Sequence, residues 1–587
     1  MKIVTTDEMR GLEKATDAAG WTYGDMMEAA GKAVAAAVER RLGHLSPGPV
    51  VILAGPGNNG GDGLVAGRWL RAWEWDVRVY AWKRPGARSD SNFHKLAGLG
   101  IPLVHAEADA DRTHLRTWLG EAAIVVDALL GTGVSRPIEG DLAAILALTR
   151  EAVSERSRQT GQAPAADEDA DTAGALFNLT EPLAELDRLD DLQPGKVEVV
   201  AVDCVSGLDC TSGAVDAAAL PADLTVTFGF PKHGHFLGRG PAVTGALLVA
   251  DIGIPGDLAQ AISLEMATPR AVAELLPARP ITAHKGAFGK ALIVAGSVYF
   301  TGAAGLAAQG ATRAGAGLVT LGVARPLHAI LAPVLLEVTW LPLAHDMGVL
   351  ASDAARMLNE KLAGYTALLI GPGLSTEKET GAFLKAFFQT EEPKAQQRSA
   401  IGFAASAPER SASKENERPA GPRTDLPPLV VDADALNWLA QQEDWPELLP
   451  ANSILTPHPG EMARLCKLEM DAVQADRWNL AVSRATAWNQ IVVLKGAFTV
   501  IAAPDGRVRV LPFANPALAT AGTGDVLAGA ITALLAQGLA PFDAAVAGAY
   551  LHGLAGDLAS QEIGFAGVVA EDIVSYLPAA WRRLSGR

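Results

Sequence analysis

Short apolar runs rich in β-branched residues alternate with longer amphipathic stretches along most of the chain. Runs of this kind predict strands, and the stretches between them predict helices. The strand-like runs cover residues 50–54, 77–81, 123–126, 197–202 and 224–228 in the first half, and 291–295, 317–322, 367–370, 429–431, 454–456, 491–494 and 498–502 in the second. Because these runs are almost continuously apolar, we expect parallel sheets with helices on both faces.

Two polar stretches interrupt this pattern. Residues 151–191 are acidic and rich in alanine, and residues 391–428 are charged and rich in serine and proline. Neither buries enough apolar surface to offset the entropy of ordering, so we expect mobile surface insertions. Strand-like runs resume after each stretch, which indicates that the insertions interrupt domains and do not separate them.

The length of 587 residues exceeds what one ordinary core supports. A stretch rich in alanine, proline and arginine between residues 256 and 280 is the expected boundary. We therefore predict an α/β protein with two domains, 1–256 and 270–587, each built on a mainly parallel sheet. The first domain should have the three layers of a Rossmann-like fold.

The net charge of −17 argues against nucleic acid and anionic membranes as partners, because phosphate contacts need basic patches. A phosphorylated ligand in a local glycine-rich site remains compatible with it. The longest apolar helical pattern, 526–536, is too short to span a membrane, and the N-terminus lacks the apolar segment of a secretory signal. We expect a soluble protein.

The chain has three cysteines, Cys204, Cys210 and Cys466. They cannot make a disulfide framework, and their spacing is not that of a zinc site. This cysteine usage is typical of the reducing cytoplasm, where we expect the protein to act.

The stretch NPALATAGTGDVLAG, residues 515–529, joins a glycine-rich turn to an apolar helix through Gly522, Thr523, Gly524 and Asp525. Glycines let an anion approach the backbone, and the helix directs its unpaired N–H groups at that anion. Asp525 beside such an anion site is suited to accept the proton of a substrate hydroxyl that faces a phosphoryl group. The alternative is a capped helix start with Asp525 in its first turn.

In the first half, VVILAGPGNNGGDG places the loop residues Asn58 to Asp62 after a buried strand and before the helix GLVAGRWLRAW. The strands ending at Asp127 and Asp203 lead into glycine turns, the second of which contains Ser206. Such strand ends meet at one edge of a parallel sheet, where ligands bind. Helix N-caps are the alternative explanation for these side chains.

Three carboxylates, Asp62, Asp127 and Asp203, would need a compensating cation beside a phosphate. A hard cation held by oxygens of Asn59, Asp127 and Ser206 would supply it. Lys232 could also contribute, but we interpret it as a solvated lysine that follows a strand.

In the second half, further polar and glycine-rich motifs follow predicted strands. His458 stands between two prolines in ILTPHPGE, as a contact group or a packed structural histidine. Lys495 in LKGAFT could hold a nucleotide, with an unremarkable turn as the alternative. The remaining motifs are HKGAFGKALIVAGS, ALLIGPGL and LVVDADAL.

The first-half motifs VVILAGPGNNGGDG, DALLGTGVSRP and VDCVSGLD resemble the NAD(P)H-hydrate epimerase family. The second-half motifs, ending in NPALATAGTGDVLAG, resemble the ADP-dependent NAD(P)H-hydrate dehydratase family, whose fold is ribokinase-like. The whole chain, apart from the two polar stretches, resembles the bifunctional enzymes that combine both. The resemblance implies repair of the hydrates of NADH and NADPH (NADHX and NADPHX): epimerisation of the R and S forms, and ADP-dependent dehydration of the S form to NAD(P)H, AMP and phosphate.

The resemblance also implies roles for individual residues. In the first domain, Asp203 would be the catalytic acid/base and potassium would be bound by Asn59, Asp127 and Ser206. The hydrate would be bound by Asn58, Asn59, Gly60, Gly61, Asp62, Gly131, Thr132, Gly133, Val134, Ser135, Arg136, Pro137 and Asp203. In the second domain, Asp525 would be catalytic, and the hydrate would be bound by Ala303, Gly373, His458 and Asp525. ADP, with Mg²⁺, would be bound by Lys495, Gly496, Ala497, Phe498, Thr499, Gly522, Thr523 and Gly524.

One position departs from the family pattern: Phe300 stands where members carry tyrosine, and Tyr299 precedes it. We expect a homo-oligomer. A ribokinase-like kinase of a small vitamin or sugar alcohol also fits the GTGD turn, and would leave a stable phosphorylated product. A nucleotide-binding scaffold or sensor without turnover is a further alternative.

Overall fold

A computed structural model describes residues 1–43, 48–85, 90–133, 136–159, 179–180, 196–389, 423 and 425–586. The chain forms two compact units, unit 1 (Met1–Met266) and unit 2 (Ala267–Arg587). The division lies inside the stretch 256–280 where the composition changes. Most of the two polar insertions lies outside the described residues. Helix α6 (Gly140–Gln159), however, continues through the first part of 151–191, so ordered structure extends further than predicted there.

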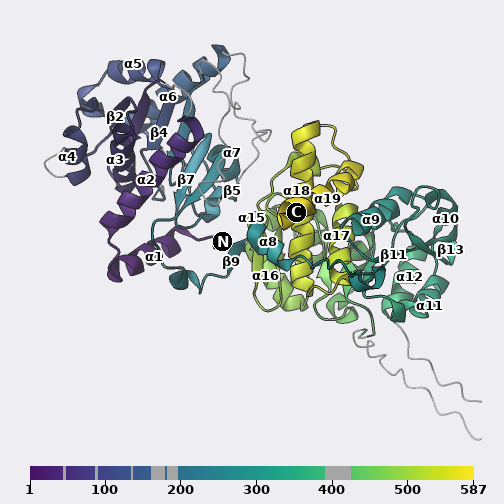
Figure 1. The fold of residues 1–587 in the computed structure, drawn as a ribbon. Helices are drawn as coiled ribbons and strands as arrows, with labels where there is room; N and C mark the ends of the chain where they lie inside the picture. Colours follow the sequence, from purple (N-terminus) through teal and green to yellow (C-terminus); the bar gives the residue numbers. More distant parts are fainter. Residues whose placement is uncertain are drawn as a thin grey trace, which may run out of the picture. The chain divides into compact units, whose positions relative to one another are not determined.

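Unit 1 contains a parallel sheet in the order β3-β2-β1-β4-β6-β7-β8-β5 (Figure 1). Its strands are β1 (Val50–Ala54), β2 (Val77–Ala81), β3 (Leu103–His105), β4 (Ile124–Ala128), β5 (Leu179–Thr180), β6 (Glu198–Val202), β7 (Leu224–Phe228) and β8 (Ala246–Ala250). The short β9 (Leu264–Met266) follows and bridges to Lys2 near the N-terminus.

Helices cover both faces of the unit 1 sheet, because alternate strand residues belong to two different apolar clusters. Val50 and Ile52 pack with helices α1 to α4, whereas Val51 and Leu53 pack with α5 and α6. The helices are α1 (Thr6–Ala18), α2 (Tyr23–Leu42), α3 (Asn58–Ala72), α4 (Ser91–Ala97), α5 (Thr113–Glu121), α6 and α7 (Gly240–Thr244). The predicted α/β class with covered parallel strands is confirmed.

Unit 2 has a second sheet with strands in the order β12-β11-β10-β15-β16-β17-β18-β19-β20, parallel up to β18 and antiparallel after it. The strands are β10 (Lys290–Val294), β11 (Leu318–Ala324), β12 (Thr339–Leu343), β15 (Ala367–Ile370), β16 (Leu429–Val431), β17 (Ile454–Leu455), β18 (Ile491–Leu494), β19 (Val500–Ala502) and β20 (Val508–Val510). A small hairpin, β13 (His345–Asp346) with β14 (Val349–Leu350), stands apart from this sheet.

The apolar helix after the glycine turn is α17 (Thr523–Ala536), which is almost completely buried. It packs against α9 (Thr301–Arg313), α18 (Pro541–Ile563) and strands of the sheet. The other helices of unit 2 are α8 (Pro269–Leu275), α10 (Arg325–Leu331), α11 (Asp353–Asn359), α12 (Lys378–Phe388), α13 (Asp434–Leu439), α14 (Pro459–Cys466), α15 (Met470–Ala475), α16 (Arg477–Trp488) and α19 (Ala570–Ser585).

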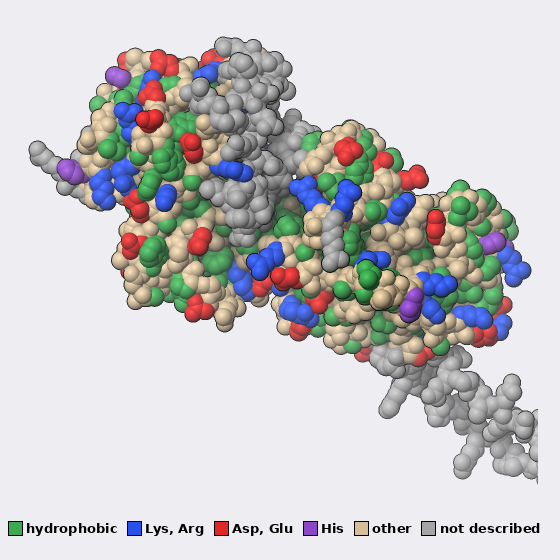
Figure 2. Space-filling model, viewed as in Figure 1, with side chains coloured by type: hydrophobic (Ala, Val, Ile, Leu, Met, Phe, Trp, Pro, Cys, Tyr) green, Lys and Arg blue, Asp and Glu red, His purple; other side chains and the backbone are tan. Residues whose placement is uncertain are grey.

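The surface carries charges of both signs. Figure 2 shows acidic and basic side chains interspersed over the visible face of the described residues. In the described part of the chain, no helix is long and apolar enough to cross a membrane.

Candidate active sites

In unit 1, β1 leads directly into α3 through a tightly packed glycine turn. The helix begins at Asn58, so Asn58 to Asp62 form its first turns and not a preceding loop, as the sequence had suggested. A Cβ on Gly55 would lie 1.8 Å from the carbonyl oxygen of Leu129, and one on Gly60 would lie 2.1 Å from that of Gly55. Only glycine fits this close approach. The turn therefore brings the N-terminus of α3 against the segment that follows β4.

Asn59, Asp127 and Ser206 come together at this edge, although they belong to three separate strand ends. The Ser206 hydroxyl donates to Oδ1 of Asp127 at 2.6 Å, and the Ser206 N–H donates to Oδ2 at 2.8 Å. Leu130 links the group, because its carbonyl accepts from the Asn59 amide at 2.7 Å and its N–H donates to the Ser206 hydroxyl at 2.9 Å. Burial raises the pKa of Asp127 to about 6.

These oxygens are of the type that a hard cation prefers. The Asp127 carboxylate is fully buried, and the hydrogen bonds found for it come from the neutral groups of Ser206 and the N–H of Leu129. Burying a charged carboxylate among neutral partners costs free energy, and a bound cation reduces that cost. Carboxylate, hydroxyl, amide and carbonyl oxygens are the ligands that such ions prefer.

Asp203 follows β6 and adopts a left-handed backbone conformation, with φ of 62°. Its Oδ1 accepts hydrogen bonds from the Thr227 hydroxyl at 3.0 Å, the Phe228 N–H at 3.2 Å and the Lys232 ammonium at 2.5 Å. Lys232 is fully buried, so its interpretation as a solvated lysine is wrong. No local motif indicates this burial, because the partner carboxylate lies 29 residues away along the chain.

Two further carboxylates face Asp203. Burial and then the charge of Asp203 raise the pKa of Asp62 well above its usual value, and the same causes raise the pKa of Glu13 on α1. Arg84 was not predicted from the sequence. It donates to the carbonyls of Gly55 and Gly57 at 2.6 and 3.0 Å, and its charge partly opposes the rise in the pKa of Asp62. Sequence reasoning found Asp62 but not Glu13, which lies on a helix with no motif around it.

The turn after β4 is described only in part. Gly131 packs against the Asn59 side chain, since a Cβ there would lie 3.2 Å from Cβ of Asn59. Thr132 is half-buried, whereas Gly133, Arg136 and Pro137 are exposed. Val134 and Ser135 lie outside the described residues.

In unit 2, the N-terminal turn of α17 meets a buried lysine. The helix begins at Thr523, and Gly522 adopts a φ of 92° before it. A Cβ on Gly524 would lie 3.6 Å from the Lys495 ammonium. The Thr523 hydroxyl bonds to the carbonyls of Leu518 and Thr520 at 2.8 and 2.9 Å. The glycine turn is thus held by Thr523, and the lysine charge lies beneath the helix N-terminus.

Asp525 stands on this turn, half-buried. Burial first, and then the charges of Asp432, Asp434 and Glu461, raise its pKa to about 7, while Lys495 opposes the shift. A carboxylate with a pKa near neutrality is suited to take up and release a proton at physiological pH.

Lys495 pairs with two acidic residues, one at a strand end and one on a helix. Its ammonium lies 2.9 Å from Oδ1 of Asp432 and 3.7 Å from Oε2 of Glu461. Asp432 also accepts from the Thr456 hydroxyl at 2.7 Å. Burial raises the pKa of Glu461 to about 7, and although burial lowers the pKa of Lys495, Asp432 and Glu461 leave it raised overall.

His458 caps helix α14 through its ring and backbone. The Gly460 N–H donates to Nδ1 of His458 at 3.0 Å, and the His458 N–H donates to Glu461 at 2.8 Å. About half of its side chain, 49%, stays exposed, so the ring is a cap with an open edge. Both interpretations of His458, as a group that contacts a ligand and as a structural residue, are compatible with this geometry.

The remaining residues predicted for the nucleotide follow β18. Arg477, absent from the sequence reading, donates to the carbonyls of Leu494, Lys495 and Ala497, and burial lowers its pKa to about 10. Phe498 is buried, and its N–H donates to the carbonyl of Phe513 at 2.8 Å. Strand β19 starts at Val500 and not at Phe498, as had been predicted. The exposed groups here are the main chain of Gly496 and Ala497.

Two of the residues predicted to bind the hydrate in unit 2, Ala303 and Gly373, lie side by side. A Cβ on Gly373 would lie 2.7 Å from Cβ of Ala303 and 2.8 Å from Cβ of Phe300. Tyr299 and Phe300 are more than half exposed, at 63% and 53%. Ser297 is fully buried, with a hydroxyl that has no hydrogen-bond partner among the described residues.

The cysteines differ from the expectation. Cys204 and Cys210 form a disulfide, which the sequence reading had not foreseen, and Cys466 is free. With three cysteines in 587 residues, sequence spacing alone carried no signal for this pair.

Two protein families match the two halves of the chain. A family model for NAD(P)H-hydrate dehydratase matches residues 291–418 and 422–579, and one for the YjeF-related protein N-terminus matches 24–163 and 173–234. A solved ADP/ATP-dependent NAD(P)H-hydrate dehydratase from Bacillus subtilis, co-crystallised with ATP and Mg²⁺, is 29% identical and covers 55% of this chain and 100% of its own, with a TM-score of 0.43.

Relatives that match nearly the whole chain identify its family. A bifunctional NAD(P)H-hydrate repair enzyme from Moorella thermoacetica is 36% identical over 95% of this chain and 92% of its own length. Enzymes of the same description from Thermofilum pendens and Escherichia coli are 34% and 31% identical, over 100% and 97% of this chain and 97% and 92% of theirs. The chain therefore belongs to the family of bifunctional NAD(P)H-hydrate repair enzymes.

Proposed function

We propose that unit 1 interconverts the R and S hydrates of NADH and NADPH, and that unit 2 dehydrates the S hydrate with ADP to give NAD(P)H, AMP and phosphate. The observation that carries the proposal is the half-buried Asp525 on the first turn of α17, with a pKa raised to about 7 beside a glycine turn. Hydroxide is a poor leaving group, so the hydroxyl of the hydrate has to be converted into a better one.

In unit 2, Asp525 takes the proton of the hydrate hydroxyl as its oxygen attacks the β-phosphorus of ADP. The bond between that phosphorus and the bridging oxygen breaks, and AMP leaves with the bonding electrons. The N–H groups of Gly522 to Gly524 and the Lys495 charge stabilise the negative oxygens of the transferring group. The ring nitrogen then expels phosphate, and loss of a proton from the adjacent ring carbon restores the dihydronicotinamide.

The binding roles in unit 2 follow the same geometry. Ala303, Gly373 and the open edge of His458 bind the hydrate, and the segment from Lys495 to Thr499 with Gly524 binds the nucleotide. Gly496 and Ala497 are exposed, which supports this role. Phe498 has a buried side chain and an N–H that is already bonded, so this residue packs against the protein. Mg²⁺ would accompany ADP as the usual counterion of a polyphosphate.

In unit 1, Asp203 exchanges a proton with the hydrate, and Lys232 keeps its carboxylate in place. Potassium would be held by Asn59, Asp127 and Ser206, where it would offset the Asp127 charge close to the bound hydrate. The N-terminal turn of α3, from Asn58 to Asp62, and the segment from Gly131 to Pro137 bind the hydrate.

An epimer-resolved assay tests the proposal. With pure R hydrate and ADP, we expect absorbance of reduced nicotinamide to recover only as R converts to S. Asp203→Asn should abolish this recovery from R but preserve it from S. A phosphorylated organic product that accumulates in place of free phosphate would favour the kinase alternative, and ADP binding without AMP formation would favour a sensor. Cytoplasmic location and homo-oligomer formation stay predictions.

A further inference from the structure

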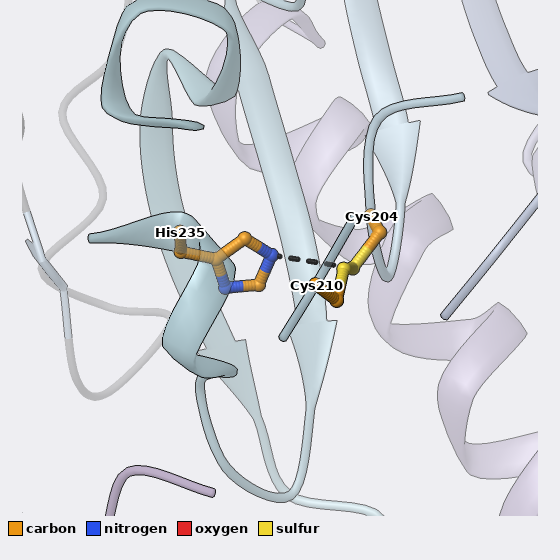
Figure 3. A group of neighbouring side chains, drawn as sticks. All are labelled: Cys204, Cys210 and His235. Carbon is orange, nitrogen blue, oxygen red and sulfur yellow. Dashed lines mark hydrogen bonds between the residues drawn. A yellow bond between two sulfur atoms is a disulfide. The ribbon is translucent and has the colours of Figure 1, made fainter. Parts of the chain in front are cut away.

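Two of the three cysteines in the chain lie within one short segment of unit 1. Cys204 directly follows Asp203, and Cys210 closes a loop that contains Ser206. Figure 3 shows the disulfide between the two cysteines with His235 beside it. Their disulfide is buried, with 0% and 1% of the two residues exposed. The bond therefore spans the segment that carries both the proposed acid/base and a proposed potassium ligand.

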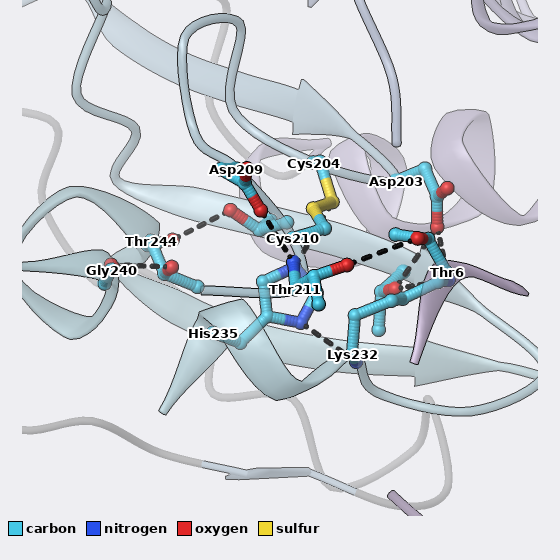
Figure 4. The surroundings of a disulfide bond; sticks show 12 residues. Thr6, Asp203, Cys204, Asp209, Cys210, Thr211, Lys232, His235, Gly240 and Thr244 are labelled. Carbon is cyan, nitrogen blue, oxygen red and sulfur yellow. Dashed lines mark hydrogen bonds and ion pairs between the residues drawn. A yellow bond between two sulfur atoms is a disulfide. The ribbon is translucent and has the colours of Figure 1, made fainter. Parts of the chain in front are cut away.

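His235 lies against this disulfide and connects it to Asp203. Its Nε2 lies 3.4 Å from Sγ of Cys204, and its Nδ1 accepts the N–H of Lys232 at 3.3 Å. Figure 4 shows His235 between the disulfide and Lys232, which bonds to Asp203. Burial lowers the pKa of His235 to about 3, so the ring is neutral.

The tautomer follows from these contacts. Because Nδ1 accepts a backbone N–H, the single proton of the neutral ring lies on Nε2 and points to Cys204. An N–H donor at a sulfur stabilises its thiolate, which makes Cys204 the better leaving sulfur in thiol–disulfide exchange. The same proton disfavours a metal at Cys204, Cys210 and His235, although their ligand atoms lie within 4.8 Å of one another.

The packing around the disulfide leaves no space for two separate thiols without movement of the loop. Val205 and Leu208 in the loop are fully buried, and Cys210 is fixed by the bond from the Gly234 N–H to its carbonyl. Reduction replaces one covalent bond by two thiols that repel at short range inside packed surroundings. On this argument, reduction would displace the segment from 203 to 210, which carries Asp203 and Ser206.

We propose that Cys204 and Cys210 form a reversible thiol–disulfide pair whose redox state sets the rate of hydrate epimerisation in unit 1 and leaves dehydration in unit 2 unchanged. The reductant is a thiol that reaches the buried pair when the loop opens locally. Its thiolate attacks Cys210 and Cys204 leaves as a thiolate, and a second thiol then attacks the mixed disulfide, which completes the transfer of two electrons and two protons. The products are two protein thiols and the disulfide of the reductant. This inference rests on the site proposed above, in which Asp203 and Ser206 serve the epimerase.

The chemical part is tested by alkylation of the full-length protein. After treatment with oxidised glutathione, denaturation and iodoacetamide, we expect one alkyl group per chain, on Cys466, and three after dithiothreitol. Three alkyl groups after the oxidant would overturn the pair. So would a stoichiometric metal ion retained by the reduced protein, since the cluster would then be a metal site.

The functional part uses the second activity as an internal control. Without ADP, reduction should slow R-to-S exchange by about threefold or more, because displacement of a positioned acid/base is costly. Oxidised glutathione should restore it, and dehydration of pure S hydrate with ADP should not change. Cys466→Ala should keep this response, and Cys204→Ala/Cys210→Ala should lose it.

The possible failures are distinguishable. Equal exchange rates in both redox states of the wild-type protein would overturn the proposed control, even with a reversible disulfide. A redox response that persists in Cys204→Ala/Cys210→Ala would overturn it too. Absence of epimer exchange in both states would instead overturn the epimerase assignment of unit 1, and the coupling with it.

Discussion

The ammonium of Lys495 lies 2.9 Å from Oδ1 of Asp432, beneath the turn that carries Asp525. The two residues come from the ends of β18 and β16, which the intervening β17 separates in the sheet. Asp432 is almost fully buried, so the lysine charge is held in place by a fixed partner and not by solvent. The pair links the turn that is proposed to bind phosphate to the sheet edge.

Asp525→Asn should reduce the rate of ADP-dependent dehydration by about 10²–10⁴-fold, with the KM for ADP little changed, because the amide cannot take the hydroxyl proton. Single-turnover formation of AMP from pure S hydrate measures the effect. Asp505→Asn, at an exposed position of the same unit, is the matched control and should keep full activity. An unaffected rate in Asp525→Asn would remove this residue from the mechanism.

The pH dependence of dehydration should follow the raised pKa of Asp525. A base acts when it is deprotonated, so kcat/KM should fall by roughly tenfold per pH unit below about 7 and level off above it. Glu461→Gln should move this midpoint to lower pH, because the charge of Glu461 is one of the groups that raise the Asp525 pKa. A rate independent of pH between about 5 and 8 would indicate a base with an ordinary carboxylate pKa.

Lys495→Met should lower the free energy of unfolding of unit 2 by about 3–5 kcal/mol, because it leaves the buried Asp432 without its cation. The double variant Lys495→Met/Asp432→Asn should recover part of that loss. Urea denaturation followed by tryptophan fluorescence measures both, with the exposed Lys361→Met as the control. Additive effects of the two substitutions would show that the pair does not couple.

Asp127→Asn should abolish the stimulation of epimer exchange by potassium, since it removes the charged ligand of the proposed site. Wild-type exchange should rise on replacement of tetramethylammonium chloride by potassium chloride at constant ionic strength, and the variant should not respond. Asp76→Asn, at an exposed side chain in the same unit, should respond like the wild type. Potassium dependence that survives in Asp127→Asn would place the ion elsewhere.

The strands were largely predictable because their apolar runs report burial directly. Val50–Ala54 and Ile491–Leu494 were predicted to the residue. The strand Thr339–Leu343 was missed, since Pro342 removes a ladder donor and is tolerated only because this strand lies at the sheet edge. Motif positions such as Asp127 and Asp525 could be proposed from the sequence, because each lies close to a glycine turn.

What the sequence did not reveal depends on contacts between distant residues. Lys232 looks like a surface lysine until β7 and the following turn bring it under Asp203. Arg477 lies on a helix with no motif, yet it bonds to three carbonyls of the segment after β18. The pairing of Cys204 with Cys210 likewise depends on how the loop folds back, which no spacing rule encodes.

The left-handed backbone at Asp203 restricts how this position can change over evolution. Glycine, asparagine and aspartate tolerate that conformation, and bulky or branched residues do not. A lineage that lost the need for epimerisation could pass from aspartate to asparagine with the loop intact. Such a descendant would keep the shape of its ancestor and differ by one atom, so resemblance in fold would conceal the lost chemistry.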